Sequence, residues 1–237
     1  SLIRIMIECC PEALKLVNNN CGTPLAMAAR WNALQVARLV VDVYPQALTI
    51  KNNDQQTPLH QALYGYCSPS PELIQFLANG CPETIRIKDS NGATPLAYIF
   101  QRSGFPRWAV ELLIEHCPDA TILSGHGKKT VLHYACHRGV PLEVLQIIVE
   151  HWPRTCLFLD NWSNPFDVAA DRNSPNAQVL EFLVQAMKTA ALSLLGKDIG
   201  GLGQVRAMNE SDDFPLASKD DKVRELIFGI EKMNAAG

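Results

Sequence analysis

Thr57-Pro58-Leu59-His60-Gln61-Ala62 is the fullest copy of a phrase that recurs along most of this chain. The copies start at Thr23, Thr57, Thr94, Thr130 and, in altered form, Asn164, at steps of 34, 37, 36 and 34 residues. A second marker, an apolar or Cys residue before proline, keeps the same rhythm and occurs at Cys10-Pro11, Tyr44-Pro45, Cys81-Pro82, Cys117-Pro118 and Trp152-Pro153. Two markers in phase indicate a solenoid, because a unit of this length buries its apolar face only against its neighbours.

The unit from Thr130 to Asp160 shows what each repeat is predicted to contain. Thr130 is suited to cap a first helix, which we expect to end at His137-Arg138-Gly139. Pro141 starts a second helix with apolar residues at a spacing of three and four, and Pro153 stops it. A short extended stretch then leads to the next copy. Each unit is therefore predicted to be a helix, a tight turn, a helix and an outward loop or hairpin.

This pattern resembles the ankyrin repeat over roughly residues 1 to 195. The motif Thr-Pro-Leu-His followed by Ala stands at Thr57 to Ala62, and the Asp-x-x-Gly lead-in stands at Asp89 to Gly92. Gln55 and Lys128 replace that glycine elsewhere, and a Pro-Glu-Ala-Leu type of stretch replaces the usual Gly-Ala-Asp after the second helix. Because non-glycine residues tolerate a positive φ poorly, we expect less regular hairpins where the glycine is lost.

The sequence thus predicts an all-α fold, an α-solenoid of about five ankyrin-like helix-turn-helix repeats with short hairpin loops and a C-terminal helical extension. Because the first residues already read as an apolar helix, we expect a longer protein whose preceding repeat contributes only its second helix and loop here. The predicted units are 1–22 (that helix and loop), the repeats 23–56, 57–93, 94–129 and 130–163, a degenerate capping repeat at 164–196, and a linker with an amphipathic helix at 197–237. We expect this last helix to fold back on the array, and docking on a partner is the alternative.

Composition narrows the classes of function. A formal net charge of -3 gives no global attraction for nucleic acid or an anionic membrane. The sequence contains no apolar run of about 18 residues, so no helix is predicted to cross a membrane. Three of the 8 cysteines, Cys10, Cys81 and Cys117, hold one repeat position, which favours reduced thiols packed as small hydrophobes in an intracellular compartment. The compartment itself stays open.

No cofactor, metal or catalytic residue is predicted. His133 and His137 have the spacing of helical metal ligands, but the resemblance implies that His133 and His60 bond backbone and tie adjacent repeats. Cys136 and His137 are sequence neighbours that point to different helix faces, which makes them a poor nucleophile and base. The glycine cluster at 200–203 follows no predicted strand and is typical of a linker. We therefore expect no enzymatic activity.

The expected function is protein–protein interaction, as an adaptor, scaffold or architectural subunit of a larger complex. The alternative is a regulatory ankyrin domain of an enzyme, channel or transporter. In ankyrin-like arrays the concave face consists of hairpin tips and first-helix ends, which implies partner-binding residues seven and eight positions after each Thr or Asn. At or beside these positions are Arg30, Trp31, Tyr64, Gln101, Arg102, His137, Arg138 and Arg172.

A second rank of candidates lies one turn earlier or on the hairpins: Tyr98, His126, Lys129, Tyr134 and Trp162. Because stacked guanidinium groups suit carboxylates, the expected partner is a protein with an acidic or mixed-charge segment. The alternative is that these residues are ordinary solvated helix ends. The oligomeric state stays open.

Overall fold

A computed structural model describes residues 2–65, 68–101, 106–118, 129–160, 163–172 and 175–194. Within these ranges the chain has eleven α-helices and no strand, which confirms the predicted all-α solenoid. The amphipathic helix expected near the C-terminus, the loop at 119–128 and Lys128 lie outside the described residues. None of the described helices has the length and apolar composition needed to cross a membrane.

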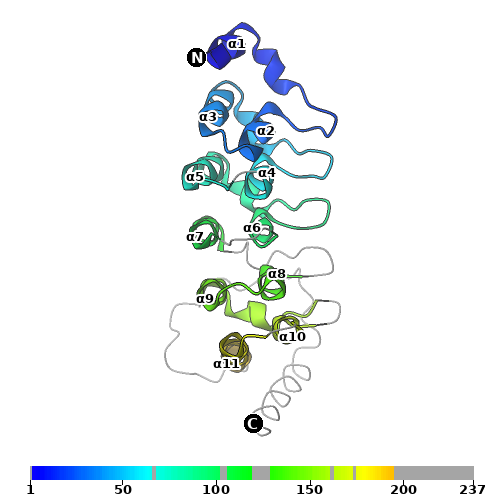
Figure 1. The fold of residues 1–237 in the computed structure, drawn as a ribbon, viewed down its shortest axis with the longest axis vertical. Coiled ribbons are helices and arrows are strands. Elements are labelled where there is room, and N and C mark those ends of the chain that lie inside the picture. The colour runs from blue at the N-terminus through cyan, green and yellow to red at the C-terminus, as the bar shows by residue number, and fades with distance from the viewer. Residues whose placement is uncertain are drawn as a thin grey trace.

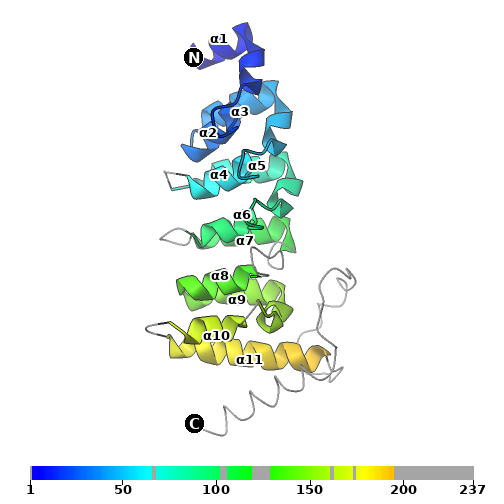
Figure 2. The same cartoon turned by 90° about the vertical axis from the view of Figure 1, so that its right-hand side faces the viewer.

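The helices stack in two columns along the long axis of the molecule (Figures 1 and 2). The first-helix column consists of α2 (Pro24–Arg30), α4 (Pro58–Tyr64), α6 (Pro95–Ile99), α8 (Val131–Arg138) and α10 (Pro165–Ala170). The second-helix column consists of α1 (Leu2–Cys9), α3 (Leu34–Val43), α5 (Pro71–Gly80), α7 (Arg107–His116), α9 (Leu142–His151) and α11 (Ala177–Leu194). Leucines of the repeated phrase, among them Leu25, Leu59, Leu96 and Leu132, are buried between the columns and form part of one continuous core.

The repeated phrase is a helix start. Thr23 Oγ1 accepts a hydrogen bond from the Ala26 N–H at 3.2 Å, and proline occupies the first helical position. Asn164 closes a capping box with Asp167, in which each side chain accepts a hydrogen bond from the other residue's backbone N–H, at 2.9 and 3.1 Å. These side chains satisfy backbone donors that the first helical turn leaves without partners.

His60 joins two repeats and completes the capping box of α4. Its Nδ1 accepts hydrogen bonds from the Thr57 N–H at 3.2 Å and the Thr57 hydroxyl at 2.9 Å. Because Nδ1 is an acceptor, Nε2 carries the proton, which it donates to the Ala93 carbonyl of the next hairpin at 3.2 Å. His133 repeats this arrangement with Thr130 and the Ser163 carbonyl. The implied role of both histidines in tying adjacent repeats is confirmed.

Within the described ranges a short 3₁₀ helix follows the second helix at four places: η1 (Pro11–Lys15), η2 (Pro45–Thr49), η3 (Pro82–Arg86) and η6 (Pro153–Leu157). The extended stretch predicted directly after Pro153 is therefore wrong. Each 3₁₀ turn begins with a proline that fixes φ, and a buried residue such as Leu14 or Ile85 anchors it to the core. Apolar periodicity gave no sign of so short an element.

Three of the described hairpins keep one geometry although their sequences differ. Gly92 has φ of 74°, and Gln55 and Cys21 adopt the same left-handed conformation at 61° and 56°. The prediction of a less regular hairpin where glycine is lost is therefore wrong at Gln55. An amide or carboxylate oxygen organises each turn: Asn52 Oδ1 accepts from two backbone N–H groups at 3.0 and 2.9 Å, and Asp89 Oδ1 does so at 2.8 and 2.7 Å.

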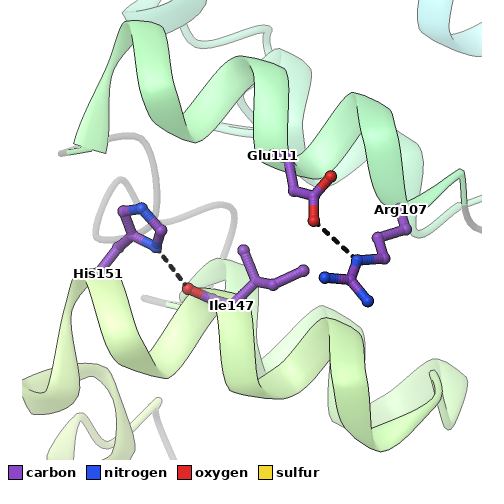
Figure 3. Close-up of polar contacts among 4 residues, drawn as sticks. All are labelled: Arg107, Glu111, Ile147 and His151. Atoms are coloured by element: carbon purple, nitrogen blue, oxygen red, sulfur yellow. Dashed lines mark hydrogen bonds and ion pairs between the residues drawn. The ribbon is translucent and has the colours of Figure 1, made fainter.

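The second-helix column carries surface ion pairs and helix-end contacts. On α7, Arg107 pairs with Glu111 at 2.7 Å, opposite Ile147 of α9 (Figure 3). At the end of α9, His151 Nδ1 lies 2.8 Å from the Ile147 carbonyl, as His116 Nδ1 does from the Leu112 carbonyl on α7. Because the Arg107–Glu111 pair is largely exposed, it adds little to stability.

Gln55→Gly is expected to raise the free energy of unfolding by about 0.5–1 kcal/mol, because Gln55 is exposed and glycine removes the strain of its positive φ. Gln46→Gly is the control, since Gln46 is exposed in η2 without a positive φ, and this change is expected to destabilise. Urea denaturation of both variants measures the difference. A loss of stability in Gln55→Gly would contradict the assignment.

Acidification is expected to weaken the array through His60. Burial is the main cause that lowers the pKa of His60 from 6.5 to about 4, outweighing its bond to the Ala93 carbonyl. Burial lowers the pKa of His133 as well. Between pH 6.5 and about 4 the unfolded chain binds a proton at His60 that the native chain does not. The free energy of unfolding therefore decreases as the pH is lowered through this window, by up to about 3 kcal/mol.

His60→Gln tests this pH dependence, because glutamine keeps a capping-box side chain and does not titrate. We expect a smaller decline in the free energy of unfolding between pH 6.5 and 4.5 than in the unsubstituted chain. His137→Gln, at an exposed position, is expected to leave the decline unchanged. Equal declines for the two variants would show that His60 is not the group responsible.

Candidate partner-binding surface

An open cleft of about 780 Å³ is lined by residues of α8 and α10, two helices of the first-helix column. Its lining residues are Lys129, His133, Tyr134, His137, Asp160, Ser163, Asp167, Val168, Asp171 and Arg172. Both signs of charge are present, with three carboxylates, a lysine and an arginine. The cleft is therefore a mixed-charge surface, in which carboxylates accompany the guanidinium group expected from the sequence.

Arg172 is held against the end of α8. Its Nη1 donates a hydrogen bond to the His137 carbonyl oxygen. Gly139, which ends α8 with φ of 64°, makes room for the guanidinium: an added Cβ would lie 2.5 Å from the Arg172 Cζ atom. A cation at this place is favourable because helix C-terminal carbonyls carry partial negative charge. At least one N–H donor of the Arg172 guanidinium is thus engaged by the protein's own backbone.

The carboxylates of the cleft differ in the hydrogen bonds that they accept from the protein. Asp167 Oδ2 accepts from the Asn164 N–H at 3.1 Å, and Asp160 Oδ1 accepts from the Ser163 N–H at 2.7 Å. Asp171 is exposed and has no side-chain hydrogen bond or ion pair within the described residues. Lys129 is likewise exposed and uncommitted within the described part of the chain. These two side chains are therefore charges of the cleft that a partner can engage without breaking a bond between described residues.

A second surface, the aromatic patch, lies over α2 and α4 and consists of Met27, Trp31 and Tyr64, which are 36%, 54% and 48% exposed. The backbones of the two helix ends touch, because a Cβ added at Gly65 would overlap the Arg30 carbonyl oxygen. Trp31 follows Arg30 and Tyr64 precedes Gly65, so both large side chains emerge from neighbouring helix ends. Exposed aromatic residues of this kind are typical anchors at protein interfaces.

Buried aromatic rings support the patch from below. The Tyr98 ring meets the Tyr64 ring edge-on, with centroids 5.7 Å apart and an interplanar angle of 82°. The same Tyr98 ring contacts the His60 ring at 5.2 Å. Tyr98 is 3% exposed, so in this structure it positions Tyr64 and offers almost no surface of its own.

A chain of hydrogen bonds crosses three repeats beneath the patch. Arg30 Nη1 donates to Gln61 Oε1 at 3.5 Å, and Gln61 Nε2 donates to Gln56 Oε1. Gln56 Nε2 donates to the Tyr98 hydroxyl at 2.6 Å, and this hydroxyl donates to Asp89 Oδ2 at 2.6 Å. Burial, followed by the hydrogen bond to Asp89, holds the pKa of Tyr98 well above its ordinary range. This network fixes the Tyr98 ring and the Gln56 and Gln61 side chains beneath the exposed Trp31 and Tyr64.

The structure separates the sequence-predicted residues into groups. Lys129, Tyr134, His137 and Arg172 come together in the cleft, whereas Trp31 and Tyr64 lie at the neighbouring ends of α2 and α4. Gln101 and Arg138 are exposed elsewhere in the column, while Arg30 is half-buried. Three of the predicted residues lie outside the described part of the chain: Arg102, His126 and Trp162.

Sequence reasoning missed Met27 and the carboxylates Asp160 and Asp167. Met27 stands at the position of Tyr98 and Tyr134, four residues after the phrase begins, so the repeat alignment contained the signal. Asp160 follows a 3₁₀ turn that was not predicted. Asp167 stands where His60 and His133 stand in the fuller copies of the phrase. Its orientation toward α8 depends on how the last repeat packs.

The described residues offer little for catalysis or metal binding. Burial raises the pKa of the Cys136 thiol to about 12, and that of Cys156 likewise, so both thiols are protonated at neutral pH. His133 uses both ring nitrogens in hydrogen bonds. No group of three His, Cys, Asp or Glu side chains in the described ranges is arranged to hold a metal ion.

Comparison with solved structures identifies the fold. The chain is similar to the ankyrin repeat domain of Bcl-3, described as a unique member of the IkappaB protein family, with a TM-score of 0.58 and 24% sequence identity. The match covers 69% of this chain and 71% of that domain. No protein-family model and no curated protein matches the sequence. The resemblance to ankyrin repeats is confirmed in the fold: this chain has the ankyrin-repeat architecture.

Tyr98→Phe is expected to lower the free energy of unfolding by about 1–3 kcal/mol, because the buried Asp89 carboxylate and Gln56 amide lose the hydroxyl they share. Tyr64→Phe is the matched control and is expected to change stability by less than about 0.5 kcal/mol, since Tyr64 is half exposed. Chemical denaturation at pH 7 measures both variants. An equal loss of stability in both variants would contradict a contribution of the Tyr98 hydrogen bonds to the free energy of unfolding.

Proposed function

We propose that this protein is a non-catalytic protein–protein interaction module that acts as an adaptor, scaffold or architectural subunit in an intracellular complex. The observation that carries the proposal is the concentration of exposed aromatic and charged side chains on the first-helix column. The aromatic patch and the cleft both lie there. Aromatic residues with nearby arginine are enriched where proteins bind one another.

The partner-binding surface in this proposal follows the ends of the first helices. Trp31, Tyr64, Gln101, Arg138 and Arg172 occupy this line, and the hairpin-side residue Lys129 adds to it. The partner is a protein segment of mixed charge. A purely acidic segment fits less well, because the three carboxylates of the cleft would repel it.

Two double variants test this assignment on a partner obtained by co-purification with the full chain. Trp31→Ala with Arg138→Ala is expected to weaken affinity at least about 30-fold, the effect of losing one interface anchor. Val43→Ser with Glu143→Gln changes exposed residues of the second-helix column and is expected to leave affinity unchanged. Calorimetric titration of purified partner measures both. Loss of affinity in the second pair alone would place the interface on the opposite column.

A further inference from the structure

The first-helix column changes character along the solenoid. Near the N-terminal end it exposes Met27, Trp31 and Tyr64, whereas the cleft between α8 and α10 exposes Lys129, Asp171 and the partly used Arg172. A partner that follows this column therefore meets an apolar anchor site first and a charged site later. From this polarity, and resting on the proposed function, we infer that the partner is one extended segment with a large apolar side chain at one end and an adjacent acidic and basic residue at the other.

The aromatic patch is built as an anchor site. Trp31 and Tyr64 emerge from helix ends whose backbones touch at Arg30 and Gly65. The edge-on contact with the buried Tyr98 ring fixes one wall of the patch before any partner arrives. A preorganised wall lowers the entropy lost on binding. An aromatic or large aliphatic side chain fits such a surface best.

The charged end of the column indicates which charged residues the partner segment carries. Lys129 precedes α8 and Asp171 directly follows α10. These two charges, which no side chain in the described part of the chain engages, therefore lie toward opposite ends of the helices that flank the cleft. In an extended chain, successive side chains point to opposite sides. One acidic residue facing Lys129 and an adjacent basic residue facing Asp171 are therefore complementary to the cleft.

The stacking of the helices sets the length of the segment. In the first-helix column α6 lies between α4 and α8 (Figure 2). At about 8–10 Å for each helix spacing, the middle of the cleft that α8 and α10 flank is about two and a half spacings from α4, or about 20–25 Å. An extended chain covers this distance with about seven residues, whereas a helical segment needs about fifteen. The separation of the anchor from the charged pair thus distinguishes an extended partner from a helical one.

A random peptide library of about 24 residues displayed on phage, long enough for either separation, is selected against the purified full chain to test the inference. Enriched sequences are expected to carry an aromatic or large aliphatic residue about seven positions from an adjacent acidic–basic pair. A synthetic consensus peptide is expected to lose at least about tenfold in affinity to Trp31→Ala with Tyr64→Ala, and similarly to Lys129→Asp with Asp171→Lys. The second variant is expected to regain affinity for a peptide with the two charges exchanged.

The control for the charge exchange is Glu143→Lys with Lys188→Glu, on α9 and α11, which is expected to leave binding unchanged. A separation near fifteen residues, no common separation, or no rescue by the exchanged peptide would overturn the inference. The proposed function would survive those results if Trp31→Ala still weakened binding. No enrichment over an unrelated protein, or binding lost only with the Glu143 and Lys188 changes, would overturn both.

Discussion

The stacking of repeats in this structure depends, at two places, on a bond from a first-turn histidine to the hairpin of the next repeat. His60 Nε2 donates to the Ala93 carbonyl while Nδ1 accepts from Thr57, so one neutral imidazole caps its own helix and fixes its neighbour. His133 does the same toward Ser163. Because no repeat buries its apolar face alone, such cross-repeat bonds hold the stack in register.

The same need to satisfy buried polar groups shapes the surface. Gln61, Gln56, Tyr98 and Asp89 form a chain of bonds from one repeat to the next, and this chain holds the ring on which Tyr64 rests. Gly65 and Gly139 act differently, by leaving space for a carbonyl and for the Arg172 guanidinium. The contacts that hold neighbouring repeats together therefore also position the side chains of the candidate interface.

Much of the fold could be predicted from the sequence because its signals are local. Proline and threonine mark each first helix, apolar spacing marks each second helix, and both follow the chain's own period. The 3₁₀ turns were missed because five residues are too few for periodicity. The hairpin at Gln55 was misjudged because Asn52 stabilises the turn through its side chain, and this compensates for the missing glycine.

The sequence by itself determined the repeat, the helix starts and the line along which exposed residues recur, since each depends on neighbours within a few positions. Only the tertiary structure decided which of those residues meet. It buried Tyr98 under Tyr64, brought Lys129 and Arg172 together with three carboxylates, and committed Arg172 to a carbonyl of the preceding repeat. These outcomes bring together residues of neighbouring repeats, such as Tyr64 with Tyr98 and His137 with Arg172, whose contacts are set by how one repeat packs on the next.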